Sequence, residues 1–177
     1  MAGKRMTSTE IWLRLMNVGD LCGDTMLGAA QKLAARENID EMTLKNVGLT
    51  SKQARNFLCV KEAELERSFN WLERPGHYLV PVDSPLYPPR LRSLSDYPGA
   101  LFVNGSIDVL SHFQLAVVGS RSPSWYGERW GNLFCEYLAR NGVTITSGLA
   151  CGIDGVAHRA SLSGQGKTVA VLGSGLS

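Results

Sequence analysis

Apolar residues in the N-terminal part of the chain recur at helical spacing. The first stripe covers residues 11–16 and follows Ser8 or Thr9, either of which can cap a helix. The second covers residues 24–34, and Asp24 is placed to cap it. Each stripe gives a helix one apolar face, so the pattern predicts two short helices that pack together.

The same spacing continues beyond these two helices. A short third helix is expected over residues 40–46. Thr50 and Gln53 then form a capping-box pattern that opens one long helix through Leu72, and a Pro-Gly pair ends it. We therefore expect a helical module over residues 1–74, which resembles modules of the SAM or helix-hairpin-helix type.

One turn of this module has a second interpretation. Residues 46–50 resemble the hairpin of helix-hairpin-helix modules, which bind the DNA backbone through hairpin amides. A structural or partner-docking role is the alternative.

Residues 75–113 form a connecting segment. Residues 77–82 and 100–103 are strand candidates, and the prolines between them exclude a regular helix.

From residue 114 the period changes to short apolar runs that alternate with helical stretches. The expected strands are residues 115–118, 143–146 and 167–172, and the expected helices are residues 124–140 and 153–162. In the first of these helices we expect the large apolar side chains to point inward, namely Trp130, Leu133, Phe134, Tyr137 and Leu138. A βαβαβ order folds by right-handed crossovers onto a parallel sheet.

The predicted fold class is therefore α/β, with a helical module followed by a Rossmann-like parallel sheet over residues 114–177. A doubly wound sheet normally has about five or six strands. We expect this sheet to be truncated, as the first half of a Rossmann-like domain, and prone to self-association through its open edge.

Composition restricts the class of protein. With 44% hydrophobic and 19% charged residues and a net charge of +2, the chain suits a folded protein without a polybasic tail. No apolar run approaches the ~20 residues of a membrane span, and no signal peptide is evident. The four cysteines are scattered, which favours free thiols and a cytoplasmic location.

Gly/Ser-rich loops follow all three predicted strands of the parallel sheet. Ligands of open α/β sheets bind beyond the carboxyl ends of the strands, where small residues expose amides to an anion. Arg121 adds a bidentate phosphate donor. The candidate phosphate-binding residues are Gly119, Ser120, Arg121, Ser147, Gly148, Gly152 and Gly155, with residues 173–175 forming the third loop. The alternatives are that tight turns simply require these residues and that Arg121 pairs with Glu128.

Other chemistry is weakly represented. There is no GxSxG nucleophile and no GxGxxG, so we expect neither a catalytic residue nor a cofactor. Asp154 and His158 share a helix face, but no third ligand is evident and no metal is expected; a helix-start carboxylate and a satisfied polar contact are preferred. Trp125 and Tyr126 suit either base stacking or a core or domain interface.

Four motifs resemble the DprA/Smf DNA-processing family in order and spacing. They are residues 87–105 (YPPRL to YPGALFVNG), residues 116–121 (AVVGSR) before Tyr126-Gly127, residues 147–158 (SGLACGIDGVAH) and residues 168–176 (TVAVLGSGL). The resemblance spans residues 10–177.

The resemblance implies a cytoplasmic, non-enzymatic protein that binds single-stranded DNA. It further implies protection of incoming DNA in natural transformation (competence), loading of a RecA-type recombinase as a recombination mediator, and a homodimer of the complete protein. The family's phosphate-contacting arginine maps onto Arg121, and its second-motif glycines map onto Gly148, Gly152 and Gly155.

This chain departs from the family pattern at Cys151, where the family usually has arginine. The missing charge is expected to weaken phosphate binding. The segment that carries most dimer and recombinase contacts in the family would follow Leu176.

Two other functions fit the residues. A Rossmann-like enzyme that cleaves nucleoside monophosphates would need a carboxylate near the anion site, and Asp154 is the candidate. Alternatively, the chain is only an interaction module whose helices bind a partner.

Overall fold

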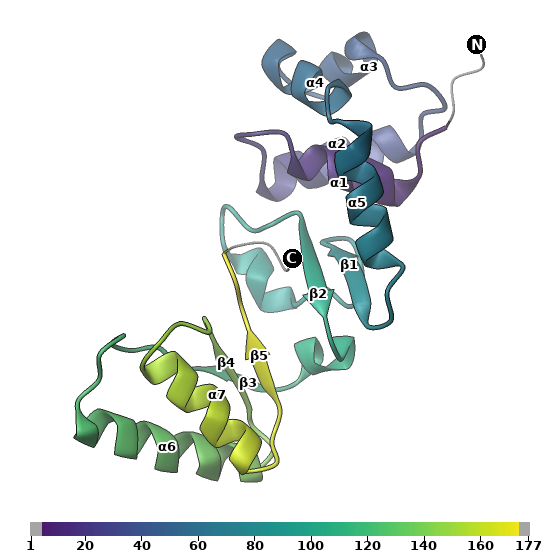
Figure 1. Cartoon of the computed structure of the whole chain (residues 1–177). Coiled ribbons are helices and arrows are strands. Elements are labelled where there is room, and N and C mark those ends of the chain that lie inside the picture. The colour runs from purple at the N-terminus through teal and green to yellow at the C-terminus, as the bar shows by residue number, and fades with distance from the viewer. Residues whose placement is uncertain (1–4, 174–177) are drawn as a thin grey trace. The chain divides into compact units, whose positions relative to one another are not determined.

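The computed structural model describes residues 5–173, which form two compact units that divide between Ile107 and Asp108 (Figure 1). The first unit carries the helices predicted at the N-terminus together with a β-hairpin. The second carries the parallel sheet. The fold class predicted from the sequence is confirmed in both parts.

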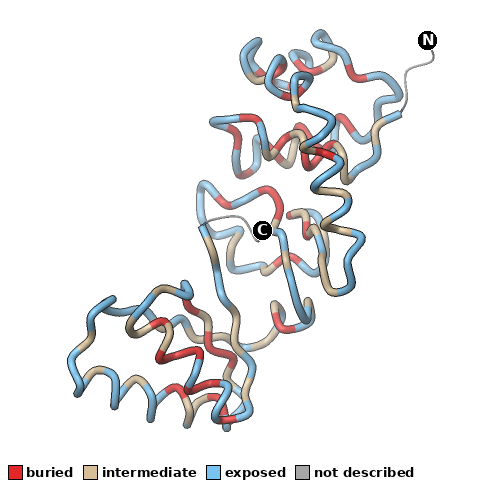
Figure 2. The backbone as a smooth tube through the Cα atoms, viewed as in Figure 1, coloured by how far each residue is buried: buried red, intermediate tan, exposed pale blue. Residues whose placement is uncertain are grey.

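The helices of the first unit surround a well-packed core. They are α1 (Ser8–Met16), α2 (Gly23–Ala34), α3 (Glu41–Asn46), α4 (Ser51–Leu58) and α5 (Glu62–Leu72). The largest side chains of this core are almost completely inaccessible, among them Trp12, Leu15, Leu33 and Phe57. Figure 2 shows the buried stretches of the backbone in red. Burial of this kind contributes about 1.5–3 kcal/mol for each large apolar side chain, which offsets the weak helical propensity of such short segments.

Two of the predicted helix starts need correction. The N-cap of α1 is Thr7, whose hydroxyl accepts the Glu10 amide at 3.1 Å, and Ser8 and Thr9 already belong to the helix. The N-cap of α2 is Cys22, without a side-chain cap bond, and Asp24 lies in the first turn. Asp24 instead accepts the hydroxyl of Tyr97 at 2.7 Å, so its carboxylate joins the helices to a later segment.

The starts of α3 and α4 follow the prediction. Asp40 caps α3 by accepting the Thr43 amide at 2.7 Å. Thr50 and Gln53 form the reciprocal capping box of α4. Capping satisfies the amides that a helix leaves unpaired at its start and contributes about 1 kcal/mol in each case.

The predicted long helix over residues 50–72 is wrong: the structure has two helices with a break at Cys59–Lys61. A glycine or proline would have marked this break in the sequence, but it contains neither. The apolar period alone did not show it. Glu62 and Glu64 lie in the first turn of α5, where the helix dipole favours negative charge. That acidic pair is the helix-start signal that the apolar pattern concealed.

The backbone amides of the turn between α3 and α4 form hydrogen bonds within the chain. They are all satisfied: Val47 by Thr43, Gly48 by Lys45, Leu49 by Leu44 and Thr50 by the Gln53 side chain. Val47 and Leu49 are buried. Since no hairpin amide within residues 46–50 is left for a phosphate, the structural interpretation of this turn is favoured over a DNA-binding hairpin.

A two-stranded hairpin completes the first unit. Strand β1 (His77–Pro81) pairs antiparallel with β2 (Ala100–Asn104), and the 3-10 helices η1 (Pro89–Ser93) and η2 (Ile107–Ser111) lie between and after the strands. The Gly23 amide donates to the Tyr97 carbonyl at 3.1 Å, and Gly99 lies against Met26 and Trp12. These contacts attach the hairpin segment to the helical core.

The second unit holds the predicted parallel sheet. Its strands are β3 (Gln114–Ala116), β4 (Thr144–Ser147) and β5 (Thr168–Ala170), paired in the order β3-β4-β5, and its helices are α6 (Trp125–Arg140) and α7 (Ile153–Ser163). Ile145 at the centre of β4 is fully buried with Cys135 of α6 and with Ala157 and Ala160 of α7. Both helices therefore cover the same face of the sheet.

Helix α6 presents a different face to its neighbours than the sequence predicted. The expected inward residues Trp130, Leu133, Phe134 and Tyr137 are between 51% and 67% exposed, and only Leu138 packs against the core. The inward face consists instead of small residues four positions apart: Gly127, Gly131, Cys135 and Ala139. A Cβ on Gly131 would lie 3.4 Å from Val156, so this face allows α6 and α7 to pack closely.

All four cysteines carry free thiols, as expected from the sequence. Cys22, Cys59 and Cys151 are exposed and Cys135 is buried. Burial raises the pKa of the Cys135 thiol, which keeps it protonated at neutral pH.

Candidate nucleic-acid interface

The first two Gly/Ser-rich loops follow β3 and β4 at the carboxyl edge of the sheet, where ligands of α/β folds bind. The first extends from Val117 to Ser124 and the second from Gly148 to Gly152. The third loop follows β5; of the sequence-predicted residues 173–175, Ser174 and Gly175 lie outside the described residues.

Arg121 lies on the first loop with an exposed side chain. Within residues 5–173 it forms no ion pair with any carboxylate, Glu128 included. The backbone around it is ordered by local bonds: the Ser122 amide donates to Ser120 Oγ at 3.1 Å, and Ser124 caps α6 by accepting the Gly127 amide at 3.2 Å. The guanidinium is therefore presented to solvent from a defined loop.

The two loops are in direct contact through glycine. Gly152 has φ +84° and ψ −133°, and a Cβ at this position would lie 2.2 Å from the Ser120 carbonyl oxygen. The Ile153 amide donates to that same oxygen at 3.1 Å. A Cβ on Gly119 would lie 2.7 Å from the Ile153 side chain. Both glycines are thus required for the close approach of the loops.

The side chain of Asp154, in the first turn of α7, already accepts hydrogen bonds from the second loop. Its buried carboxylate accepts the amide of Gly148 at 3.2 Å and that of Ala150 at 3.4 Å. Ser147 also turns inward, since its hydroxyl donates to the Val117 carbonyl at 2.6 Å. Ser147 and two of the loop amides therefore hold the loop itself together. The helix-start role expected for Asp154 is confirmed, and the carboxylate additionally orders the loop before the helix.

His158 is buried on the same helix, one turn later. The Thr168 hydroxyl donates to the Ile145 carbonyl at 2.8 Å, so the His158 Nδ1 proton must be the donor in its 2.6 Å contact with that hydroxyl. Nε2 is buried without a partner, and burial lowers the pKa of the imidazole, partly opposed by Asp154. The expected satisfied contact is thus found on one nitrogen only. Across residues 5–173, no group of three His, Cys, Asp or Glu side chains suits a metal ion.

Two arginines that the sequence reasoning did not single out lie near these loops. Arg159 is exposed on α7, and its Nη1 lies 3.1 Å from where a Gly155 Cβ would stand. The Arg129 guanidinium lies over the Trp125 ring, 5.3 Å from its centroid. Arg159 follows Gly155 by four residues, and Arg129 follows Trp125 by four residues. Residues at this spacing are neighbours on the surface of a helix.

Trp125 and Tyr126 are not core residues of this unit. They are 72% and 64% exposed at the start of α6, directly after the Arg121 loop. Tyr126 also contacts Trp130 edge to face, with ring centroids 6.1 Å apart.

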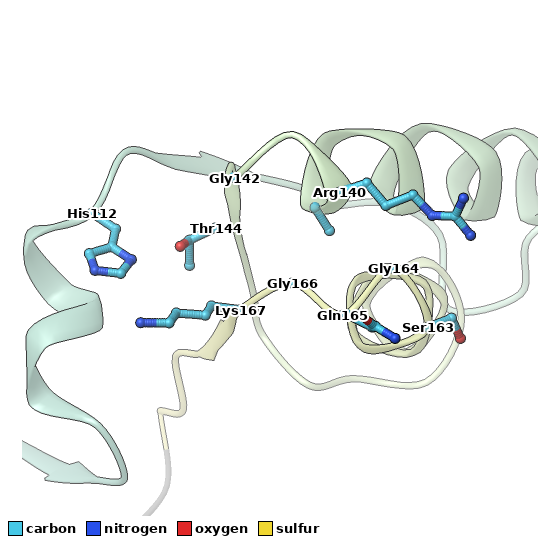
Figure 3. Close-up of a pocket in the computed structure, with 10 residues that line it drawn as sticks. His112, Arg140, Gly142, Thr144, Ser163, Gly164, Gln165, Gly166 and Lys167 are labelled. Carbon is cyan, nitrogen blue, oxygen red and sulfur yellow. The ribbon is translucent and has the colours of Figure 1, made fainter.

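A separate hollow of about 690 Å³ lies at the opposite end of the sheet, beside the starts of β4 and β5. Figure 3 shows His112 and Lys167 extending toward it, whereas Arg140 points away from them. Its charges are already matched: Lys167 pairs with Asp108 at 3.3 Å and lowers the pKa of that carboxyl, and His112 lies 3.8 Å from it. This hollow therefore has less free positive charge than the Arg121 loop.

None of the helices within residues 5–173 is long and apolar enough to cross a bilayer.

Comparison with known families decides the relationship. Residues 78–177 match the family model for DNA recombination-mediator protein A, and residues 6–70 match that for the SMF/DprA SAM domain. The chain belongs to the DprA/Smf family. The resemblance found on the four sequence motifs is thereby confirmed, as is the SAM-like nature of the helical module.

Individual relatives agree with this assignment. The chain is 57% identical to Protein Smf of Escherichia coli over 97% of its own length and 46% of that protein. It is 39% identical to DNA processing protein DprA of Bacillus subtilis over 56% of the chain and 34% of the relative. The crystal structure of DprA from Streptococcus pneumoniae aligns with a TM-score of 0.75 at 29% identity, covering 97% of this chain and 59% of that one. The DprA/Smf chain described here thus spans about half the length of its relatives.

Proposed function

We propose that this chain binds single-stranded DNA, with Arg121 as the principal phosphate contact. The observation that carries the proposal is an exposed guanidinium, without a carboxylate partner among the described residues, on a loop locked in place by Gly152. Such a group loses no internal ion pair when it takes a bidentate hydrogen bond to a phosphate. The name of the Bacillus subtilis relative, DNA processing protein, and that of the matching family, DNA recombination-mediator protein, support DNA as the ligand.

The other members of the proposed phosphate site are backbone groups. Gly119 and Ser120 directly precede the arginine, Gly152 is the N-cap of α7, and Gly155 lies in the first turn of that helix. Within residues 5–173 the amides of Leu149, Cys151 and Gly152 donate to no protein acceptor. We assign these free amides to phosphate and keep Ser147 and Gly148 in the site as supports, since their polar groups are used within the chain.

For the complete protein we propose the role that the family resemblance implies. It would protect single-stranded DNA in the cytoplasm during natural transformation, load a RecA-type recombinase onto it, and act as a homodimer. The family description as a recombination mediator supports this assignment.

We further propose that the chain is not an enzyme. The alternative, cleavage of nucleoside monophosphates, needs a carboxylate free to act on the sugar. Asp154 is buried and accepts two loop amides, so it is used in holding the loop. A folded chain that released free base from a nucleoside monophosphate, with loss of release in Asp154→Asn, would refute this part of the proposal.

The binding test is fluorescence anisotropy of a labelled single-stranded oligonucleotide with the chain and two variants. Arg121→Ala should raise the dissociation constant at least severalfold, because a charge-assisted bond contributes about 1.5–3 kcal/mol. Arg140→Ala is the matched control, since this arginine is exposed like Arg121 but lies at the far end of α6 and pairs with Glu136. Equal affinities of both variants and the parent chain would remove Arg121 from the site.

A further inference from the structure

A groove on α6 begins where the Arg121 loop ends. It has a volume of about 440 Å³ and is lined by Trp125, Glu128, Arg129, Asn132 and Leu133. These residues recur at helical spacing along one side of α6. The groove is therefore a continuous strip that starts at the first residue of the helix.

The chemistry of this groove differs from that of the phosphate loop. The positive charge of Arg129 is opposed by Glu128 within the same lining, so the groove has no net charge to attract a phosphate. The indole of Trp125, the side chain of Leu133 and the amide of Asn132 provide an apolar surface and a group that both donates and accepts hydrogen bonds. A flat, uncharged ring with polar edges, such as a nucleobase, matches this combination.

The Trp125 ring is held ready for such a contact. It is 72% exposed, and Arg129 lies over it with 5.3 Å between the guanidinium carbon and the ring centroid. This cation–π contact restricts the orientation of the indole and leaves most of the side chain exposed. An exposed aromatic ring is the usual platform on which proteins stack bases of a single strand.

Trp125 follows Arg121 by four residues, so their Cα atoms are at most ~14 Å apart even in an extended chain. We propose that Trp125, backed by Arg129, stacks a base of the strand whose phosphate binds Arg121. This inference rests on the proposed function, because it needs a strand at the Arg121 loop. It adds a base-contacting subsite to a site that otherwise contacts only phosphates.

The test separates bases from backbone by using two labelled probes of equal length, oligothymidylate and an abasic oligonucleotide. Trp125→Ala should weaken oligothymidylate binding by at least about fivefold, the lower end for loss of one stacked base. The affinity of Trp125→Ala for the abasic probe should equal that of the parent chain. Trp125→Phe should restore most of the affinity for oligothymidylate. Trp130→Ala is the matched control, since this exposed tryptophan of α6 lies outside the groove.

The outcomes distinguish the two proposals. Suppose that Arg121→Ala weakens the binding of both probes. If Trp125→Ala then weakens the binding of neither probe, or weakens the binding of both probes equally, the base subsite is refuted and the phosphate site stands. If the folded parent chain binds neither probe, the proposed function fails and the subsite with it. Circular dichroism of each variant verifies that the helices are intact.

Discussion

The contact between the two loops predicts a large effect for a very small substitution, Gly152→Ala. This glycine has a positive φ, and an added Cβ would lie 2.2 Å from the Ser120 carbonyl oxygen and 2.7 Å from the Arg121 backbone. All of these neighbours are backbone atoms, which cannot rotate away as a side chain would. The Arg121 loop must therefore move when a methyl group is added.

The magnitude follows from two separate costs. A non-glycine residue in this sparsely populated region costs about 1–3 kcal/mol. Overlap with packed neighbours typically adds about 1–3 kcal/mol. Gly142→Ala is the matched control within the same unit, because Gly142 has φ +81° but no atom within 4 Å of its added Cβ. It should show the cost of left-handed backbone alone, about 1–2 kcal/mol.

The assay is peptide-resolved hydrogen exchange combined with urea unfolding of both variants and the parent chain. Gly152→Ala should lower the free energy of unfolding by more than Gly142→Ala, and amides of both loops should lose protection. The same variant should bind single-stranded DNA less tightly, since the loop that carries Arg121 is displaced. Equal destabilisation by the two variants, with unchanged protection of the loops, would refute the proposed coupling of the loops through Gly152.

Two further predictions concern pH and rest on buried titratable groups. Burial lowers the pKa of His158 below its ordinary 6.5, so the unfolded chain binds a proton at this side chain more readily than the folded chain does. The free energy of unfolding should therefore keep its full value above pH 6.5 and decrease as the pH falls below it. Urea unfolding at several pH values should show this decrease weakened in His158→Gln, and an unchanged profile would exclude the histidine as its source. Burial and the bond to Asp24 raise the pKa of Tyr97 to about 12, so stability should decrease as the pH rises from about 10 toward 12. Tyr97→Phe should lose that alkaline decrease in the same assay, and a decrease of equal size in the variant would show that other groups cause it.

Much of the fold was predictable from local signals. The capping box at Thr50 and the βαβαβ order were correct, because each depends on residues close in sequence. The strand positions were correct to within a few residues. What local signals could not supply was the choice of face in α6, where large apolar residues and small ones form competing stripes. The small stripe of Gly127 and Gly131 packs inward because close contact with α7 requires it.

The candidate site was predictable in its location and less so in its details. The sequence predicted that Arg121 follows a strand of the parallel sheet at its carboxyl edge, and the structure has it in the loop after β3. The sequence could not show that Gly152 contacts the other loop, nor that Asp154 accepts the Gly148 amide, since both depend on tertiary contacts. The Arg129 contact with Trp125 is an i, i+4 pair that a search for helical neighbours would have found.

The central claim, that Arg121 binds a DNA phosphate, is tested most directly by the salt dependence of binding. The dissociation constant for a single-stranded oligonucleotide should be measured at several salt concentrations for the parent chain, Arg121→Ala and Arg140→Ala. Each phosphate contact on a single strand contributes about 0.7 to the slope of log affinity against log salt. We predict that Arg121→Ala reduces the slope by about that amount while Arg140→Ala leaves it unchanged. If the slope for Arg121→Ala equalled that of the parent chain, the claim would be contradicted, because the arginine would then make no contact with a phosphate.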